Sequence, residues 1–162
     1  HRDLHSFPTR RSSDLVTNSK GESSKNLIKR LSDSGVKMNV TAVFTVEQTQ
    51  EIVESFHPET ANIVSVFAGR IADSGIDPIP IMQDCLSTIK SKPKTELLWA
   101  SPREVLNLIQ ANEIGCHIIT ITCDLLKKTK LIGKNLEEYS RETVEMFFND
   151  ASAAGYKIET KQ

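Results

Sequence analysis

The feature that most constrains the fold of this chain is a repeated unit. In each unit, a short run of β-branched and apolar residues is followed by a turn and then by an amphipathic helical pattern. Four such runs begin at Met38, Ile63, Glu96 and Ile118, between 22 and 33 residues apart. The runs lack the polar alternation of half-exposed strands, which predicts a parallel sheet buried on both faces and covered by helices.

The same pattern predicts the extent of the elements. Strands are expected at 38–44, 63–67, 96–100 and 118–122, and helices at 23–31, 46–56, 78–89 and 136–154. A further helix is expected after Ser101, because this serine has the character of an N-cap, with Pro102 at the first helical position and Glu104 completing a capping box. That helix would bury three apolar side chains, Val105, Leu108 and Ile109.

Two α/β architectures satisfy this pattern, a doubly wound open sheet and part of a (β/α)₈ TIM barrel. No glycine-rich fingerprint follows any strand, and the strands are short and of similar length, which favours the barrel. The chain has 162 residues, whereas a complete barrel typically needs ~250. The expected fold class is therefore α/β, either an open domain or roughly the C-terminal half of a barrel.

Composition excludes several functions. The formal net charge of −1 gives no positive surface for nucleic acid, and no apolar run approaches the ~20 residues that span a bilayer. The three cysteines (Cys85, Cys116 and Cys123) match no C-x-x-C or zinc-ligand spacing. We expect them to be buried reduced thiols of a cytoplasmic protein.

The N-terminal segment differs from the rest of the chain. Residues 1–15, HRDLHSFPTRRSSDL, show neither the strand nor the helix period. The segment resembles a translated sequencing adapter joined to a truncated reading frame. We therefore expect residues 1–15 to be a non-native leader without a fixed packed place, and residues 16–162 to be the domain.

The C-terminal segment is an expected amphipathic helix that carries Val144, Phe147 and Phe148 and ends at Gly155. Two interpretations stay open for it. The helix either closes the core of its own chain or forms an arm that packs against a neighbouring subunit.

In a βα barrel, chemistry takes place at the C-terminal ends of the strands. Arg70 follows the strand at 63–67 by three residues, after Gly69, which allows close approach of a backbone to a ligand. An arginine there can hold a phosphate, although a solvated Arg70 paired with Asp73 is the alternative. Ser101 is a second, weaker phosphate candidate at a helix N-terminus. His117, at a strand start, is expected to be structural, and His57 to be solvated.

Three runs, VTNSKGESSKNLIKRLSDSGVKMNVTAVFT, SVFAGRIADSGIDP and ELLWASPREV, are similar to the transaldolase family in order and spacing. The resemblance covers residues 16–160. It implies a (β/α)₈ barrel enzyme without metal or organic cofactor, which transfers a dihydroxyacetone unit between sugar phosphates through a lysine Schiff base. A close branch of the family cleaves fructose 6-phosphate as an aldolase.

The resemblance also implies roles for individual residues. Thr41 matches the threonine that helps to hold the catalytic water. Ser65, Phe67 and Arg70 match an S-x-F-x-x-R pattern, in which serine and arginine grip the substrate phosphate and the aromatic ring shapes the water site. Aldolase-type members tend to have tyrosine there, so Phe67 favours transaldolase. Ser101 roughly matches a second phosphate-contacting serine.

One departure from the family pattern bears on activity. The nucleophilic lysine is expected three residues before Val16, where this chain has Ser13. The resemblance therefore implies a fragment of a cytoplasmic transaldolase of the pentose phosphate pathway, homo-oligomeric when intact and inactive in this form. The alternatives are a fructose-6-phosphate aldolase and a non-catalytic half-barrel that binds sugar phosphates. The acceptor aldose cannot be deduced from the sequence.

Overall fold

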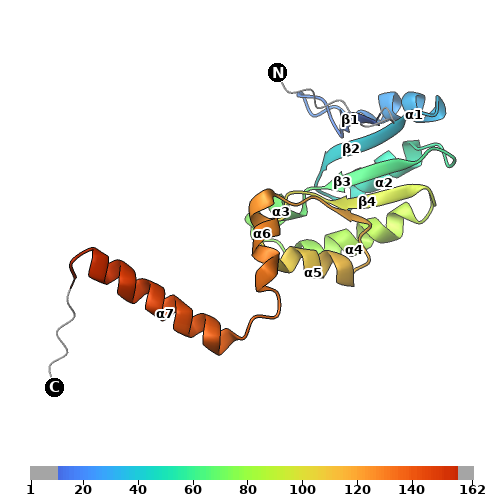
Figure 1. Cartoon of the computed structure of the whole chain (residues 1–162). Coiled ribbons are helices and arrows are strands. Elements are labelled where there is room, and N and C mark those ends of the chain that lie inside the picture. Colours follow the sequence, from blue (N-terminus) through green and yellow to red (C-terminus); the bar gives the residue numbers. More distant parts are fainter. Residues whose placement is uncertain (1–10, 157–162) are drawn as a thin grey trace. The chain divides into compact units, whose positions relative to one another are not determined.

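The computed structural model describes residues 11–156, which fall into two compact units, one ending at Leu126 and the other beginning at Lys127. The first unit is built on a five-stranded sheet in which the strands follow one another in sequence order (Figure 1). All neighbouring strands are parallel, as the sequence predicted. The strands are β1 (Arg11–Leu15), β2 (Lys37–Val43), β3 (Asn62–Val66), β4 (Thr95–Trp99) and β5 (Ile118–Ile119).

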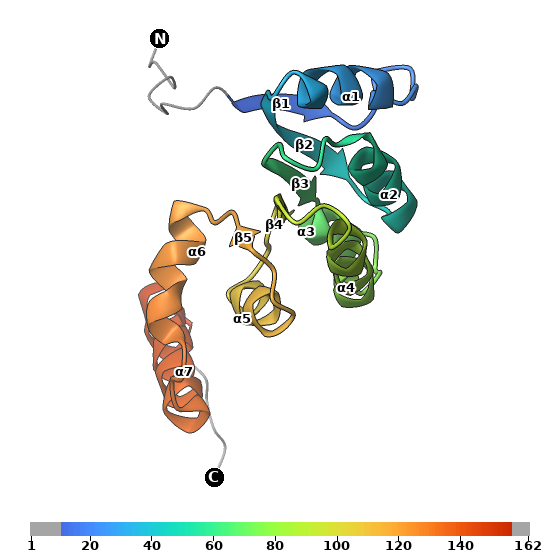
Figure 2. The ribbon, with the colours of Figure 1, turned by 90° about the vertical axis from the view of Figure 1, so that its right-hand side faces the viewer.

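Helices alternate with these strands along the chain. In the first unit they are α1 (Lys25–Asp33), α2 (Val46–Ser55), α3 (Ala68–Asp73), α4 (Pro78–Ile89) and α5 (Leu106–Glu113). Figure 2 shows α1, α2, α4 and α5 following the curve of the sheet along one of its faces. A curved parallel sheet with helices on its outer face is the wall of a partial TIM barrel, which confirms the predicted fold class.

The two faces of the sheet bury different amounts of apolar surface. The main core lies between the sheet and the helices and includes Val40, Val64 and the fully buried Trp99. The other face, the inner face of the barrel wall, carries a smaller cluster of Ile63, Leu98, Ala100, Phe67 and Ile118. Apolar burial on the helical side thus stabilises the unit, whereas the inner face buries fewer apolar side chains.

Most predicted elements are confirmed with small shifts at their ends. Strands β2, β3 and β4 each begin and end one residue earlier than expected, and β5 has two residues instead of five. Helix α4 begins and ends at the predicted residues, because the Asp77 side chain accepts a hydrogen bond from Ile79 N at 3.0 Å and Pro78 occupies the first turn. Helix α2 begins at Val46, because the side chains of Thr45 and Gln48 form a capping box there.

The predicted helix start at Pro102 is wrong. Helix α5 begins at Leu106, and Ser101 does not cap it because its φ of 62° is left-handed rather than extended. The buried Asn107 side chain organises the preceding loop instead, accepting hydrogen bonds from Arg103 N at 2.8 Å and Glu104 N at 3.1 Å. With this later start, Ile109 is exposed rather than buried.

The expected lack of a fixed packed place is not seen for Arg11–Leu15, and their expected non-native origin stays a prediction. These residues form β1, and their backbone pairs in parallel with β2 from Lys37 to Thr41. The edge of β2 offers unpaired N–H and C=O groups, which any extended backbone can satisfy whatever its side chains are. Residues 1–10 lie outside the described part of the chain.

The second unit consists mainly of one helix. Helix α6 (Cys123–Lys128) and the 3₁₀ turn η1 (Thr129–Leu131) lead into α7 (Leu136–Ala153), which begins where the Asn135 side chain accepts a hydrogen bond from Glu138 N. The predicted helix is confirmed. Its large apolar side chains, including Val144, Phe147 and Phe148, are exposed, and the interpretation as an intersubunit arm stays a prediction.

Candidate functional site

The C-terminal ends of β2, β3 and β4 bring the predicted site residues to one edge of the sheet. Thr41 lies near the end of β2, Ser65, Phe67 and Arg70 lie at and after the end of β3, and Ser101 lies two residues after β4. Backbone hydrogen bonds fix these ends to one another: Phe67 N donates to Val43 O at 2.8 Å, and Ala100 N donates to Val66 O at 2.8 Å. The pairing thus gathers residues that are up to 60 positions apart in sequence.

Ser65 is buried on the inner face of the sheet. Its hydroxyl donates a hydrogen bond to Asn39 Oδ1 at 2.5 Å, across the β2–β3 pair. Asn39 was not singled out in the sequence, although a polar residue between the buried Met38 and Val40 is the signal that would have identified it. Ser65 thus belongs to a polar pair with Asn39, and its contact with the substrate phosphate stays a prediction.

Thr41 lies where the regular pairing of β2 and β3 is interrupted. The register shifts between Val40 and Val43, and Ala42 between them has φ 62°. Such bulges bend a strand and redirect its side chains, and they are common beside functional sites. Thr41 is half-buried, and its carbonyl accepts a hydrogen bond from Val16 N at 3.1 Å.

Phe67 forms the floor on which Arg70 lies. The guanidinium carbon of Arg70 is 5.3 Å from the centre of the Phe67 ring, a cation–π distance. The Phe67 ring also stacks at a tilt on Phe44, with centroids 5.8 Å apart. Phe67 itself packs with the inner-face cluster of Ile63, Leu98 and Ala100.

The alternative pairing of Arg70 with Asp73 is not present. Arg103 binds the Asp73 carboxylate through two hydrogen bonds, from Nε to Oδ1 at 3.0 Å and from the second guanidinium nitrogen to Oδ2. Within residues 11–156, no carboxylate pairs with Arg70, which is exposed. Its five N–H donors are therefore available to an anionic ligand.

Gly69 has a different role from the one predicted. A Cβ added to it would lie 1.5 Å from Ser101 O, so glycine is required because the backbone of Ser101 occupies that space. Gly69 N also donates to Ala100 O at 3.3 Å. The close approach thus joins the start of α3 to the loop after β4. Ser101 is held in this contact rather than at a helix N-terminus.

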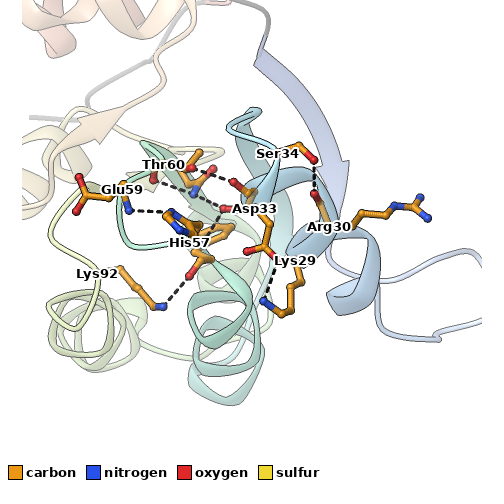
Figure 3. A network of polar contacts seen from close by, with 11 residues as sticks. Lys29, Arg30, Asp33, Ser34, His57, Glu59, Thr60 and Lys92 are labelled. Carbon is orange, nitrogen blue, oxygen red and sulfur yellow. Dashed lines mark hydrogen bonds and ion pairs between the residues drawn. The ribbon is translucent and has the colours of Figure 1, made fainter.

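At the opposite end of the strands, polar side chains bond to one another. The buried Asn62 accepts a hydrogen bond from Met38 N at 3.1 Å and donates to Ser32 Oγ at 3.3 Å and Thr60 O at 3.0 Å. Figure 3 shows part of this network, with Thr60, His57, Glu59 and Lys92 drawn from the segment before β3 and the turn before β4. It holds α1 to the start of β3.

The two histidines within residues 11–156, His57 and His117, lie where the sequence predicted. His117 Nδ1 accepts a hydrogen bond from Leu97 N at 3.2 Å, a structural contact at the N-terminal end of the sheet. His57 is exposed, and its Nδ1 accepts a hydrogen bond from Glu59 N. His57 precedes β3 and His117 precedes β5, so both histidines lie at the N-terminal ends of strands and neither is placed to act at the C-terminal end.

The three cysteines are free, as expected, but they are not all buried. Burial raises the pKa of the Cys85 thiol above its ordinary value, against a smaller lowering effect of the hydrogen bond with Thr49. Burial also raises the pKa of the half-buried Cys116 thiol. Cys123 is exposed, which corrects the expectation that all three are buried. The raised pKa values leave Cys85 and Cys116 as poor nucleophiles at neutral pH.

Two kinds of feature are not found within residues 11–156: a metal-ligand cluster and a membrane-spanning helix. No three His, Cys, Asp or Glu side chains are grouped to hold a metal ion. None of the helices in this part of the chain is long and apolar enough to cross a bilayer.

A curved parallel βα sheet, with Arg70 exposed beyond the C-terminal end of β3, is part of a TIM-barrel protein. Comparison with known proteins gives the family. Residues 21–161 match the model of the Transaldolase/Fructose-6-phosphate aldolase family, so the chain belongs to that family.

Two curated relatives illustrate the similarity. A "Probable transaldolase" of Nitrosopumilus maritimus is 36% identical over 102 residues, which are 62% of this chain and 44% of the relative. A "Probable transaldolase" of a Thermoanaerobacter species is 31% identical over 129 residues, 79% of this chain and 56% of the relative. The chain thus spans about half the length of the curated relatives it matches.

Proposed function

We propose that the intact protein transfers a dihydroxyacetone unit between sugar phosphates, and that this chain supplies the phosphate-binding part of its site. Family membership supports a transaldolase or aldolase type of enzyme. The single observation that carries the proposal is the state of Arg70. Its guanidinium is exposed and lies over the Phe67 ring, and within residues 11–156 no carboxylate pairs with it, since Arg103 binds Asp73.

The free guanidinium suits a phosphate ester for physical reasons. A planar fork of N–H donors forms paired, charge-assisted hydrogen bonds with phosphate oxygens. Because the ring fixes the head group, less side-chain freedom is lost when the ligand binds. Thr41, Phe67 and Ser101 are the proposed neighbours of the substrate. Ser65 acts behind them, by orienting Asn39 on the inner face.

The proposed chemistry needs a lysine amine at the C-terminal end of a strand. In a Schiff-base mechanism, a lysine amine adds to the ketose carbonyl and loses water, and the resulting imine accepts the electron pair of the broken carbon–carbon bond. By the family pattern, that lysine belongs at position 13, where Ser13 stands. Position 13 pairs with Asn39 in the β1–β2 register. A lysine in this place would stand beside the polar pair formed by Asn39 and Ser65.

Phe67 favours the transferase over the aldolase within this family. Its ring has no hydroxyl and is occupied by Phe44 on one side and by Arg70. A non-catalytic half-barrel that binds sugar phosphates uses the same Arg70 contacts and needs no lysine. Restoring the lysine distinguishes the catalytic proposal from this second candidate. The cytoplasmic location and the homo-oligomer of the intact protein also stay proposals.

The binding part of the proposal is tested by Arg70→Ala, with Arg30→Ala on α1 as the matched control. Fructose 6-phosphate should raise the midpoint of thermal unfolding of the original chain and of the control. Arg70→Ala should weaken binding by about 1.5–3 kcal/mol, the usual contribution of hydrogen bonds to a charged group. An unchanged thermal shift in Arg70→Ala would show that the sugar phosphate binds elsewhere.

The catalytic part is tested by trapping with borohydride. The chain as it stands should form no adduct with fructose 6-phosphate and show no transaldolase turnover, because binding alone cannot replace a nucleophile. A chimaera that supplies the upstream half of a related enzyme and lysine at position 13 should form the adduct. The same chimaera with alanine at position 13 is the control. An adduct on the unmodified chain would contradict the assignment and make Lys20 the first lysine to test.

A further inference from the structure

The short helix α3 carries a carboxylate beside the arginine of the proposed phosphate site. Arg70 and Asp73 are three residues apart within this helix. Side chains at this spacing lie on the same side of a helix, with Cβ atoms about 5–6 Å apart, and an arginine and an aspartate so placed can form an ion pair. Asp73 is therefore placed to occupy the guanidinium that a substrate phosphate needs.

Arg103, from the loop after β4, binds this carboxylate instead. Its Nε donates to Asp73 Oδ1 at 3.0 Å, and a second guanidinium nitrogen donates to Asp73 Oδ2. Both carboxylate oxygens thus accept hydrogen bonds from one planar group, a geometry that arginine provides and lysine does not. Arg70, in contrast, lies over the Phe67 ring and pairs with no carboxylate in residues 11–156.

The position of Arg103 is set by its backbone and by Gly69. Arg103 N donates to Oδ1 of the buried Asn107 at 2.8 Å, which fixes the loop from which the side chain extends. Arg103 Nε lies 3.4 Å from the place that a Cβ of residue 69 would occupy. The guanidinium of Arg103 therefore lies against Gly69, the residue before Arg70, and from there it binds Asp73 at the end of α3.

We propose that Arg103 is a positioning residue of the sugar-phosphate site, which keeps Arg70 available to the phosphate by binding Asp73. This role rests on the proposed function of Arg70, and it adds a second arginine that acts without touching the substrate. The side chains of Arg103 and Asp73 are 47% and 51% exposed, so their ion pair contributes little to the stability of the fold. Its effect is on the choice of partner for Arg70.

Removal of Arg103 would leave the Asp73 carboxylate without its partner. Asp73 would then pair with Arg70 in a fraction of the molecules, and the phosphate would have to displace it. An exposed ion pair of ordinary strength would leave Arg70 free in about a sixth to a third of the molecules, which lowers the apparent affinity about three- to sixfold.

The test compares three variants of the whole chain by calorimetric titration with fructose 6-phosphate. Arg103→Ala should weaken binding about three- to sixfold. Asp73→Asn should not weaken binding, because the competing carboxylate is removed. The double variant Arg103→Ala/Asp73→Asn carries neither charge, so its net charge equals that of the original chain, and it should regain the original affinity.

Lys29→Ala is the matched control. Lys29 also binds an aspartate, Asp33, in an exposed ion pair of 2.9 Å on α1. Its removal releases a carboxylate and lowers the net charge by the same amount as Arg103→Ala, but it leaves α3 unchanged, so affinity should stay the same. Thermal unfolding without ligand verifies that each variant is folded. Arg103→Ala keeps the backbone hydrogen bond to Asn107.

The NMR signal of the Arg70 Nε–H group gives a second readout, which needs no ligand. In Arg103→Ala this signal should shift, because Arg70 pairs with Asp73, and in the double variant it should return to its original position. A merely structural effect of losing the Arg103 side chain would not be reversed by a further substitution at Asp73. Arg70→Ala assigns the signal.

Recovery of both the affinity and the Arg70 signal in the double variant supports the proposal. A double variant as weak as Arg103→Ala would overturn it, since Arg103 would then bind the phosphate itself. Equal affinity of Arg103→Ala and the original chain, or an unshifted Arg70 signal in Arg103→Ala, would also overturn it. If the original chain binds no fructose 6-phosphate, the proposed function fails, and the Arg70 signal alone then decides whether Arg103 keeps Arg70 from Asp73.

Discussion

The two ends of the parallel strands are built on opposite principles. At the N-terminal end, the side chains of Asn62, Ser32 and Thr60 bond to one another and to the backbone. At the C-terminal end, Arg70 has no carboxylate partner, and Ala42 and Ser101 are the non-glycine residues with φ near 62° in the described chain. One end satisfies its polar groups, and the other holds strained backbone and a free charge.

This difference between the two strand ends indicates that one end of the barrel wall contributes mainly to stability and the other mainly to the proposed function. Left-handed φ values at residues with a Cβ cost about 1–2 kcal/mol each, so they persist only where surrounding contacts over-determine them. At Ser101, the close contact with Gly69 and the bridge from Arg103 to Asp73 hold the loop after β4. The hydrogen-bonded N-terminal end helps to compensate for that strain. The buried Thr95 Oγ1, which has no hydrogen-bond partner in the described part of the chain, is the exception at this end.

The largest effect is expected for Gly69→Ala, which would break the C-terminal end. The new Cβ would lie 1.5 Å from Ser101 O, a backbone atom that cannot move without displacing the loop after β4. We expect a loss of more than about 4 kcal/mol in the free energy of unfolding, as for severe core disruptions. Urea unfolding measures it, and the stabilisation by fructose 6-phosphate should disappear as well.

Gly75→Ala is the control for this substitution. Gly75 has φ 82° and no atom within 4 Å of an added Cβ, so it should lose only about 1–2 kcal/mol through backbone strain. Similar losses at the two glycines would mean that the contact between Gly69 and Ser101 does not hold the site.

The next effect is expected for Asn62→Ala, which breaks the N-terminal end. Met38 N and Ser32 Oγ would each lose a partner, and the buried Met38 N–H would be left unsatisfied. The expected loss is about 2–3 kcal/mol in the free energy of unfolding, which urea titration measures. The exposed Asn112→Ala is the control and should change stability little. Affinity for the sugar phosphate should stay the same, because Arg70 lies at the other end. A parallel loss of affinity would mean that the two ends are coupled.

Much of the wall was predictable because its signals are local. The β-branched runs and the helical period predicted β2, β3, β4 and α4 to within one residue at each end, since burial on one side imposes the pattern directly on neighbouring residues. Arg70 was identified for the same reason, because its distance from the end of a strand can be counted along the chain. The free state of its charge was not predictable.

The remaining features depend on contacts between distant residues. Arg103 and Asp73 are 30 positions apart, and Ser65 and Asn39 are 26 apart, so no local period reveals either pair. The left-handed Ser101 has the residue type of an N-cap, and only the contact with Gly69 shows why it does not act as one. Strand β1 was missed because its pairing uses backbone atoms, whereas the prediction relied on side chains.

The smallest effect concerns the surface charges of the N-terminal end. Glu59 and Lys94 form an ion pair of 2.7 Å, and the hydrogen bond and charge of Lys94 lower the pKa of the Glu59 carboxyl below its ordinary value. A carboxyl with a lowered pKa binds its proton less readily in the folded than in the unfolded chain. The pair therefore stabilises the fold above the unfolded pKa of ~4.3, and this contribution is lost as the pH falls through the folded value.

Both partners of this pair are exposed, so salt should screen the pair, and its removal should hardly change stability at neutral pH.

An NMR titration of the Glu59 side-chain carboxyl carbon measures the pKa directly. Lys94→Met should raise this pKa to its ordinary range, and the distant Lys20→Met should leave it low. If Lys94→Met left the Glu59 pKa low, the ion pair would not form in solution. The N-terminal end would then owe its stability to the buried network around Asn62 alone. Buried hydrogen bonds, and not paired surface charges, would distinguish this end from the C-terminal end with its unpaired Arg70.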